Sequence, residues 1–184
     1  PSQASANALT FGAVVQDAIS TAAEEDAFTF EANAGDIILV RMSPTSGTLD
    51  PSIRITHRSG ETLCSDYDYY RAAEIAKCTM PESGTYTLRA TDHNLIKTGN
   101  YALYIQRLNA PGNVKPTDLG TTQSGSITTG AMLNSYVIDG QAGDRLVFQV
   151  TGTSGNIHPR IQVYDTEGSL RCQNSSTYSP VFLD

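Results

Sequence analysis

The chain has 184 residues, and its 12 basic and 19 acidic residues give a formal net charge of −7 at pH 7. An acidic surface repels phosphate backbones, so the composition argues against nucleic acid as a partner. The longest apolar runs, such as 37–40, are far shorter than the roughly 18 residues that a membrane-spanning helix needs. A hydrophobic content of 39% allows a buried core and argues against wholesale disorder.

The predicted elements are β-strands, because apolar and polar residues alternate with a period of two. Turn signals rich in Gly, Pro, Ser and Asn separate these segments. In chain order, the alternating segments are 27–31, 52–56, 85–90, 101–105, 146–150 and 160–164. Short strands at regular spacing predict an all-β chain built as antiparallel sandwiches.

An internal repeat is the strongest signal in the sequence, and it aligns segment 12–64 with segment 120–172 without a gap. The two segments are identical at 14 positions. Composition alone would produce about three identities. Segment 17–26 could form a turn of helix, but its counterpart 125–134 is rich in glycine, so both are predicted to be loops.

The repeat divides the chain into two predicted domains. A cluster of turn formers at 109–113 marks the boundary between a first β-sandwich module, 1–108, and a second module, 109–184. Segment 77–108 of the first module has no counterpart in the second. The second sandwich is therefore predicted to be incomplete and to lack its C-terminal strands.

Five motifs, taken together and in this order, resemble the bacterial pre-peptidase C-terminal domain family. They are Asn-Ala-Gly-Asp at 33–36, Ser-Gly-Thr-Leu-Asp-Pro at 46–51, Ser-Gly-Glu-Thr-Leu at 59–63, Pro-Glu-Ser-Gly-Thr-Tyr-Thr-Leu at 81–88 and Thr-Gly-Asn-Tyr-Ala-Leu at 98–103. The resemblance covers nearly all of 8–108 and, for its first two thirds, 116–184. It implies secreted, jelly-roll-like sandwiches in tandem, without activity of their own. The second module departs from the pattern at one position, where His158 replaces Asp50.

The chain has three cysteines. Cys64 and Cys78 enclose segment 65–77 of the first module, and in a protein of secreted appearance they are predicted to form a disulfide. The alternative is a pair of reduced thiols. Cys172 is the counterpart of Cys64, whereas the counterpart of Cys78 would stand at position 186. Either the chain is a fragment of a longer protein, or Cys172 is a free thiol or bridges another chain.

The three histidines have no zinc spacing, and the sequence contains no nucleophile elbow and no nucleotide-binding loop. We therefore predict no catalytic residue, no metal site and no cofactor. Calcium at Asp66 and Asp68 is the one alternative, weighed against an ordinary solvated loop. Because these residues become Asn174 and Ser176 in the repeat, a metal site shared by both modules is disfavoured.

The loop that holds these two carboxylates also contains Tyr67, Tyr69 and Tyr70, and it is the candidate binding loop. Amphipathic aromatic rings can stack on sugars or contact a protein partner. They can equally well pack on the sandwich, and only Tyr70 has an aromatic counterpart, Tyr178.

The function predicted from these patterns is a non-catalytic extracellular structural module of a surface protein or fibre. Its partners would be further copies of itself or neighbouring modules. Missing strands expose unpaired backbone, so modules are predicted to assemble head to tail by strand complementation, with 1–9 as a candidate donor.

The alternative is an accessory domain of a secreted hydrolase that binds carbohydrate or protein. An enzyme with an unrecognised site is the third hypothesis. Neither nucleic-acid binding nor membrane insertion is expected.

Overall fold

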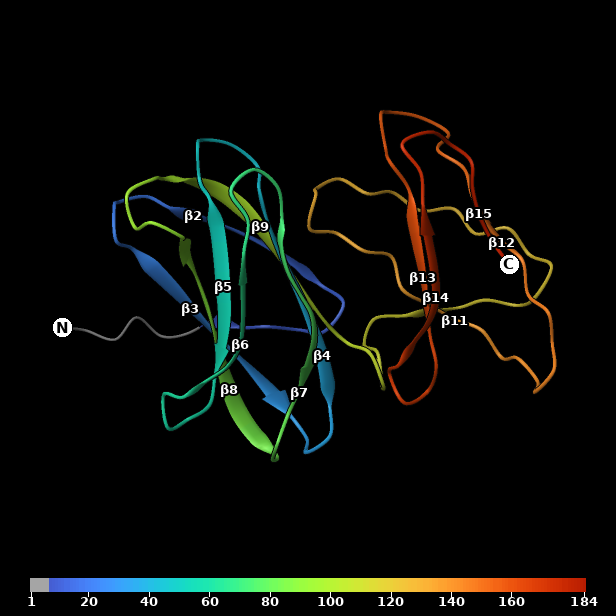
Figure 1. Cartoon of the computed structure of the whole chain (residues 1–184), viewed down its shortest axis with the longest axis horizontal. Helices are drawn as coiled ribbons and strands as arrows, with labels where there is room; N and C mark the ends of the chain where they lie inside the picture. Colours follow the sequence, from blue (N-terminus) through green and yellow to red (C-terminus); the bar gives the residue numbers. More distant parts are fainter. Residues whose placement is uncertain (1–6) are drawn as a thin grey trace.

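The N-terminal half of the chain is a sandwich of two β-sheets. The computed structural model describes residues 7–184, which contain strands but no helix, and hence no helix able to cross a membrane. One sheet has the order β1-β3-β8-β5-β6, and the other has the order β2-β9-β4-β7 (Figure 1). The strands are β1 (Asn7–Ala8), β2 (Val14–Ile19), β3 (Glu25–Ala32), β4 (Ile37–Pro44), β5 (Pro51–Thr56), β6 (Thr62–Tyr67), β7 (Ala73–Thr79), β8 (Gly84–Asp92) and β9 (Gly99–Arg107). The predicted all-β fold class is confirmed.

The core lies between the two sheets, where the alternating pattern places every second side chain. In β8, Tyr86, Leu88 and Ala90 are buried, and the residues between them are more exposed. Val40 of β4 and Leu103 of β9 join the same cluster from the facing sheet. Burial of an aliphatic side chain such as Val40, Leu88 or Leu103 contributes about 1.5–3 kcal/mol relative to its exposure, so this core accounts for the stability of the sandwich.

The loop predicted at 17–26 is wrong. Strand β2 runs to Ile19 and pairs along its length with β9, and β3 begins at Glu25, so only the turn at 20–24 remains outside the strands. Strand β2 lies at the edge of its sheet and its middle is exposed, so polar residues occupy that part. These residues interrupt the apolar pattern by which a strand is predicted from the sequence.

The N-terminal segment has a different role from the predicted one. Asn7–Ala8 pair in parallel with β3 of the same sandwich, and the N–H of Leu9 then donates to the carbonyl of Thr29. This part of the candidate donor 1–9 is therefore paired within its own chain. Residues 1–6 lie outside the described residues.

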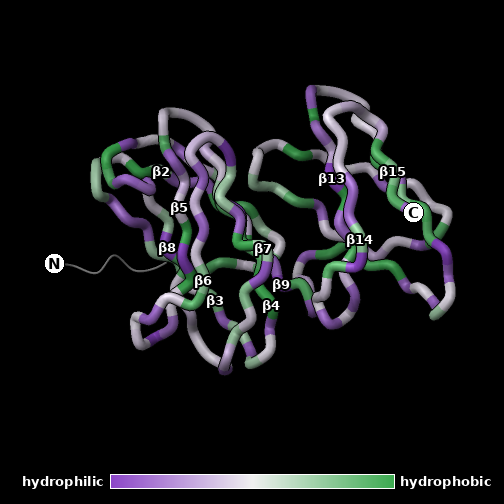
Figure 2. The backbone as a smooth tube through the Cα atoms, viewed as in Figure 1, coloured by the Kyte–Doolittle hydropathy of each residue, from purple (hydrophilic) through white to green (hydrophobic). Residues whose placement is uncertain are grey.

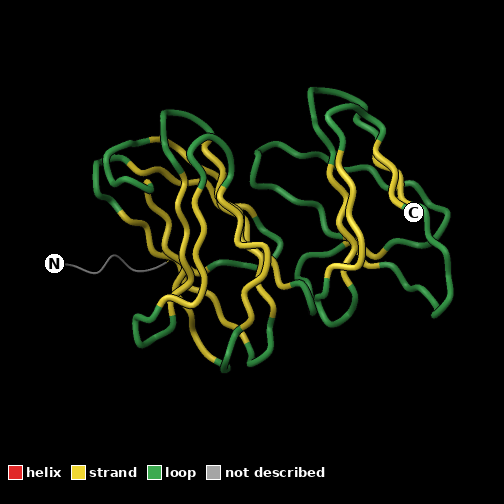
Figure 3. The backbone as a smooth tube through the Cα atoms, viewed as in Figure 1, coloured by secondary structure: helices red, strands yellow, loops and turns green. Residues whose placement is uncertain are grey.

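The C-terminal half contains short strand pairs separated by long loops (Figure 3). The pairs are β10 (Lys115–Pro116) with β11 (Tyr136–Val137), β12 (Phe148–Val150) with β15 (Val181–Leu183), and β13 (Arg160–Tyr164) with β14 (Leu170–Ser175). The strand predicted at 146–150 is thus shorter than expected. Segment 109–113 lies outside the strands, between β9 and β10, and the domain boundary at residue 108 stays a prediction.

Two of these pairs repeat the register of the N-terminal sandwich, with the same offset as the sequence repeat. The corresponding Cα partners are Val40↔Ile75 with Phe148↔Leu183, and Ile55↔Cys64 with Val163↔Cys172. In the pairs β5·β6 and β13·β14, even the register irregularity follows the same position. The strand arrangement β4·β7 and β5·β6 is therefore present twice in the chain.

The turn that precedes β4 is repeated as well. Gly35 and Gly143 both have positive φ, 85° and 95°, a conformation that glycine adopts without steric cost. In each turn the next residue, Asp36 or Asp144, accepts a hydrogen bond of 2.8 Å from the backbone N–H three residues earlier. The same residues thus form the same turn in both halves.

The C-terminal half covers the outer face of the four-stranded sheet, beside β4 and β7 (Figure 1). Leu39, Ala102 and Tyr104 form a second apolar cluster there with Ala131 of the C-terminal half. At the edge of this contact, the guanidinium of Arg160 lies 2.7 Å from the carboxylate of Glu74. Strands β4 and β9 are consequently buried on both faces.

Candidate functional site

The candidate binding loop forms an aromatic surface at one end of the N-terminal sandwich. Tyr67 is the last residue of β6, and its ring stacks on that of His93, with centroids 3.7 Å apart and an interplanar angle of 11°. The ring of Tyr69 stands nearly perpendicular to both, 5.4 Å from Tyr67 and 5.3 Å from His93. Tyr70 follows with 94% of its surface exposed. We call these four residues the tyrosine surface.

The two carboxylates of the loop hold its backbone. Asp68 accepts hydrogen bonds from the N–H groups of Tyr70 and Arg71, at 2.7 and 2.6 Å. Asp66 accepts one from the N–H of Glu74 at 2.7 Å, across to the start of β7. Both side chains therefore stabilise the turn that carries the tyrosines. Within residues 7–184, no group of three or more His, Cys, Asp or Glu side chains is placed to hold a metal ion.

Two buried carboxylates, Asp50 and Asp92, lie close to the tyrosine surface. The ammonium of Lys97 is 2.7 Å from the carboxylate of Asp50, and this hydrogen bond raises the pKa of Lys97. Burial alone would raise the pKa of Asp92, but hydrogen bonds from the backbone N–H groups of Asp50, Lys97, Ile96 and Asn94 lower it. The anion of Asp92 thus shapes the loop after β8, which carries His93.

The charge of Asp50 also acts on the phenol of Tyr69. Desolvation, together with the neighbouring Tyr67 and the charge of Asp50, raises its pKa. Tyr69 is consequently a neutral phenol at physiological pH. Neutral aromatic rings with hydroxyl tips suit stacking and hydrogen bonding, not catalysis by a phenolate.

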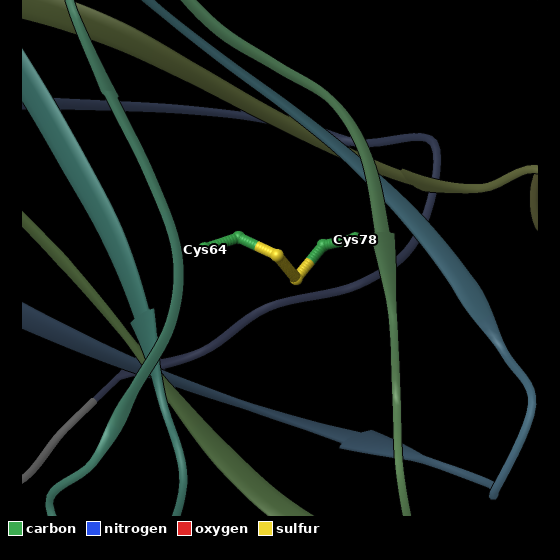
Figure 4. The surroundings of a disulfide bond; sticks show 2 residues. All are labelled: Cys64 and Cys78. Atoms are coloured by element: carbon green, nitrogen blue, oxygen red, sulfur yellow. A yellow bond between two sulfur atoms is a disulfide. The ribbon is translucent and has the colours of Figure 1, made fainter.

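The predicted disulfide between Cys64 and Cys78 is confirmed, and it joins the two sheets. Cys64 lies on β6, the edge of the five-stranded sheet, and Cys78 lies on β7, the edge of the four-stranded sheet (Figure 4). The two Cα atoms are 6.0 Å apart. The bridge therefore closes one side of the sandwich and anchors both ends of the segment that contains the tyrosines.

Cys172 lies on β14 in the register position of Cys64 and is partly exposed. It has no disulfide partner among residues 7–184. Its role stays a prediction, either as one half of a disulfide with a residue outside this sequence or as a free thiol.

A second polar cluster occupies the opposite end of the sandwich. The imidazole of His57 contacts the hydroxyl of Ser59 at 3.1 Å through Nδ1 and the carboxylate of Glu82 through Nε2. The hydroxyl of Ser59 also accepts from the N–H of Glu61, so it belongs to the hydrogen bonding of the turn between β5 and β6. These contacts connect the turn between β5 and β6 with the turn that precedes β8.

His93 is the member of the tyrosine surface that the sequence did not reveal. It is distant from Tyr67 along the chain and meets it because β5 lies between β6 and β8, with Tyr67 opposite Ser52 and Ser52 opposite Thr91. No local pattern around His93 signals this contact. Only the strand order brings the loop after β8 beside the loop after β6.

No protein-family model and no curated protein matches the sequence. Among solved structures, the chain is similar to the pre-peptidase C-terminal domain of a collagenase from Bacillus anthracis, at 15% identity, with 58% of this chain and 99% of that chain covered and a TM-score of 0.48. It is also similar to PliG, a periplasmic inhibitor of g-type lysozyme from Aeromonas hydrophila, at 15% identity, with 55% and 96% covered and a TM-score of 0.40. At this identity the likenesses assign no role to any residue of this chain.

Proposed function

We propose that the chain is a non-catalytic extracellular module, built from β-sandwiches in series, that serves as a structural part of a surface protein or fibre. Its C-terminal half takes up β-strands at the free edges of β12 and β13. The resemblance of its motifs to pre-peptidase C-terminal domains supports the extracellular location. The disulfide agrees with it, because such bonds persist in oxidising compartments.

The observation that carries the proposal is the difference in strand pairing between the two halves. In the N-terminal sandwich, β4 pairs with β7 and β9, and β5 pairs with β6 and β8. Their counterparts β12 and β13 each pair with a single strand among residues 7–184. Unpaired strand edges bind further strands readily. Two successive strands with the pattern of β8 and β9, one for each sheet, would fill both positions, whether they come from the same protein or from another copy.

The experiment supplies these two strands. A chain extended after Asp184 by a copy of 77–108 is compared with one extended by the same residues in scrambled order. Because the tether raises the effective concentration of the added strands, we expect amides of β12 and β13 to become strongly protected from hydrogen exchange only with the native order. Equal protection in the two chains would refute strand uptake at these edges.

A second candidate function is ligand binding at the tyrosine surface. The specific observation is that rings from two separate loops gather at one solvent-facing place, with Tyr67 and Tyr69 each about half exposed. Such a surface suits the apolar faces of sugar rings or an exposed peptide. This would make the chain an accessory domain that directs a secreted hydrolase to polysaccharide or protein.

The repeat provides a matched pair of variants for this candidate. Tyr70→Ala changes the tyrosine surface, whereas Tyr178→Ala changes its counterpart, which is likewise exposed but belongs to the other half. In co-sedimentation with insoluble polysaccharides, we expect weaker binding for Tyr70→Ala and for Tyr69→Ala, and unchanged binding for Tyr178→Ala. If the native chain binds none of the polysaccharides tested, this candidate survives only for a protein ligand.

A further inference from the structure

The contact between the two halves consists of a turn on one side and a sheet face on the other. The turn 129–132 places Ala131, which is fully buried, against Leu39, Ala102 and Tyr104 of the four-stranded sheet. Beside it, Gly130 lies so close to Ser43 that a Cβ atom at position 130 would collide with the serine hydroxyl. Small residues at the tip of the turn thus allow close approach to the sheet.

The internal repeat supplies a second copy of this turn at the start of the chain. Thr21 and Ala23 are identical to their counterparts Thr129 and Ala131. In both turns the N–H of the fourth residue donates to the carbonyl of the first at 3.2 Å. The N-terminal turn, however, is exposed at Ala22 and Ala23. Leu95 accepts a hydrogen bond from the N–H of Ala23, so the exposed side chains of Leu95 and Ile96 extend the apolar tip.

The repeat also supplies a second copy of the sheet face at the other end of the chain. The counterpart of Leu39 is Val147, which is 70% exposed. On the same face Phe182, the counterpart of Glu74, lies opposite Gln149 and is 52% exposed, and Figure 2 shows hydrophobic residues along β15. Apolar side chains so exposed on a sheet face are typical of an interaction surface.

We propose that the turn 20–24 of one copy of this chain docks on the outer face of β12 and β15 of a second copy, in the way that turn 129–132 docks on β4 and β9. The two surfaces lie at opposite ends of the molecule (Figure 1). The contact is therefore heterologous, and its repetition produces open rows of molecules instead of closed dimers. Neither surface is a free strand edge, so this docking is independent of strand uptake.

The contact between copies is weaker than the internal one. Within the chain, Leu133 packs against the sheet cluster, whereas its counterpart Glu25 forms ion pairs with Arg54 and Arg89. Ala23 has a φ of 63°, whereas the φ of Ala131 is not positive, so the two turns differ in backbone conformation at this residue. The internal contact also benefits from the high effective concentration of a short linker. Association is accordingly expected at high micromolar protein concentration.

Sedimentation velocity of the full chain, from low micromolar to near-millimolar concentration, tests the proposal. The average mass of the native protein is expected to rise with concentration and to pass that of a dimer. Ile96→Glu changes only the apolar tip formed by the docking turn with Leu95 and Ile96, and Val147→Glu changes only the docking face. Both residues are exposed, so folding is preserved. Each variant alone should remain monomeric. An equimolar mixture should form dimers and nothing larger, because it contains one intact turn and one intact face per pair.

Tyr178→Glu, an exposed substitution in the loop between β14 and β15, serves as the control and should associate like the native chain. A native protein that stays monomeric at every concentration would overturn the proposal. So would a mixture of the two variants that does not dimerise. Association that persists in both single variants would also overturn it, and would point to the free edges of β12 and β13 as the contact.

Discussion

Ile55 of β5 and Val163 of β13 occupy the same register position in two copies of one hairpin, yet their surroundings differ. Ile55 is completely buried between two sheets, whereas Val163 is only partly buried. The hairpin is thus encoded locally, since the same turn and the same pairing form in both halves. Burial requires more than the hairpin, because the N-terminal core joins strands from Ile19 to Ile105. A repeat of the local signals alone does not produce a repeat of the core.

The largest expected difference between the halves concerns these two residues. Ile55→Ala leaves a cavity in a closed core and should lower the free energy of unfolding by about 2–5 kcal/mol. Val163→Ala removes fewer atoms from a partly solvated site and should lower it by less than about 1 kcal/mol. Urea unfolding followed by circular dichroism measures both. Equal losses would show that the C-terminal half has a closed core of its own.

The cysteines provide the next comparison. Replacing both Cys64 and Cys78 by serine removes a bridge between positions with a sequence separation of 14, and should lower the free energy of unfolding by about 3 kcal/mol. Cys172→Ser, at the register position of Cys64 but without a partner among residues 7–184, should change it by less than about 0.5 kcal/mol. Unfolding under non-reducing conditions measures the difference. A large loss for Cys172→Ser would indicate that this thiol is bonded in the native protein.

Substitutions in the two turns that contain Asp36 and Asp144 should differ less in their effect on the free energy of unfolding. Both carboxylates accept the same backbone hydrogen bond, but Asp36 also forms an ion pair with Arg107 at 3.1 Å. Asp36→Ala should therefore cost about 1–2 kcal/mol and Asp144→Ala about 0.5–1 kcal/mol. Thermal unfolding midpoints of the two variants test this order. The reverse order would mean that the second turn carries contacts beyond those described.

The smallest effect is a pH dependence confined to the N-terminal sandwich. Because backbone hydrogen bonds lower the pKa of Asp92 below its ordinary value of about 3.9, its anion stabilises the fold above about pH 4. This contribution is lost as the pH falls through the folded-state pKa. The urea concentration at the unfolding midpoint of the native chain should therefore decrease when the pH is lowered below about 4. In the same pH range, the difference between this midpoint and that of Asp92→Asn should become smaller. A constant gap down to pH 2 would contradict this role.

Much of the fold could be predicted from the sequence where each strand has one apolar face. Segments 52–56 and 85–90 alternate cleanly because β5 and β8 pack on the core with one side. Strand β2 was not predicted because its exposed middle is polar and breaks the alternating pattern. Its strand conformation depends instead on its pairing with β9. At the candidate site, the tyrosines were apparent from their clustering in one loop. His93 was not, because its contact with Tyr67 crosses three strands.

By itself, the sequence determined the properties that depend on near neighbours along the chain. These are the strand alternation, the glycine turns, the position of the disulfide and the repeat with its register. Only the tertiary structure decided that one end of the sandwich gathers four aromatic rings, and that the outer face of β4 is covered while that of β12 is free. The physical reason is range: hydrogen bonds of a turn act over a few residues, whereas burial is a collective property of strands brought together from distant parts of the chain.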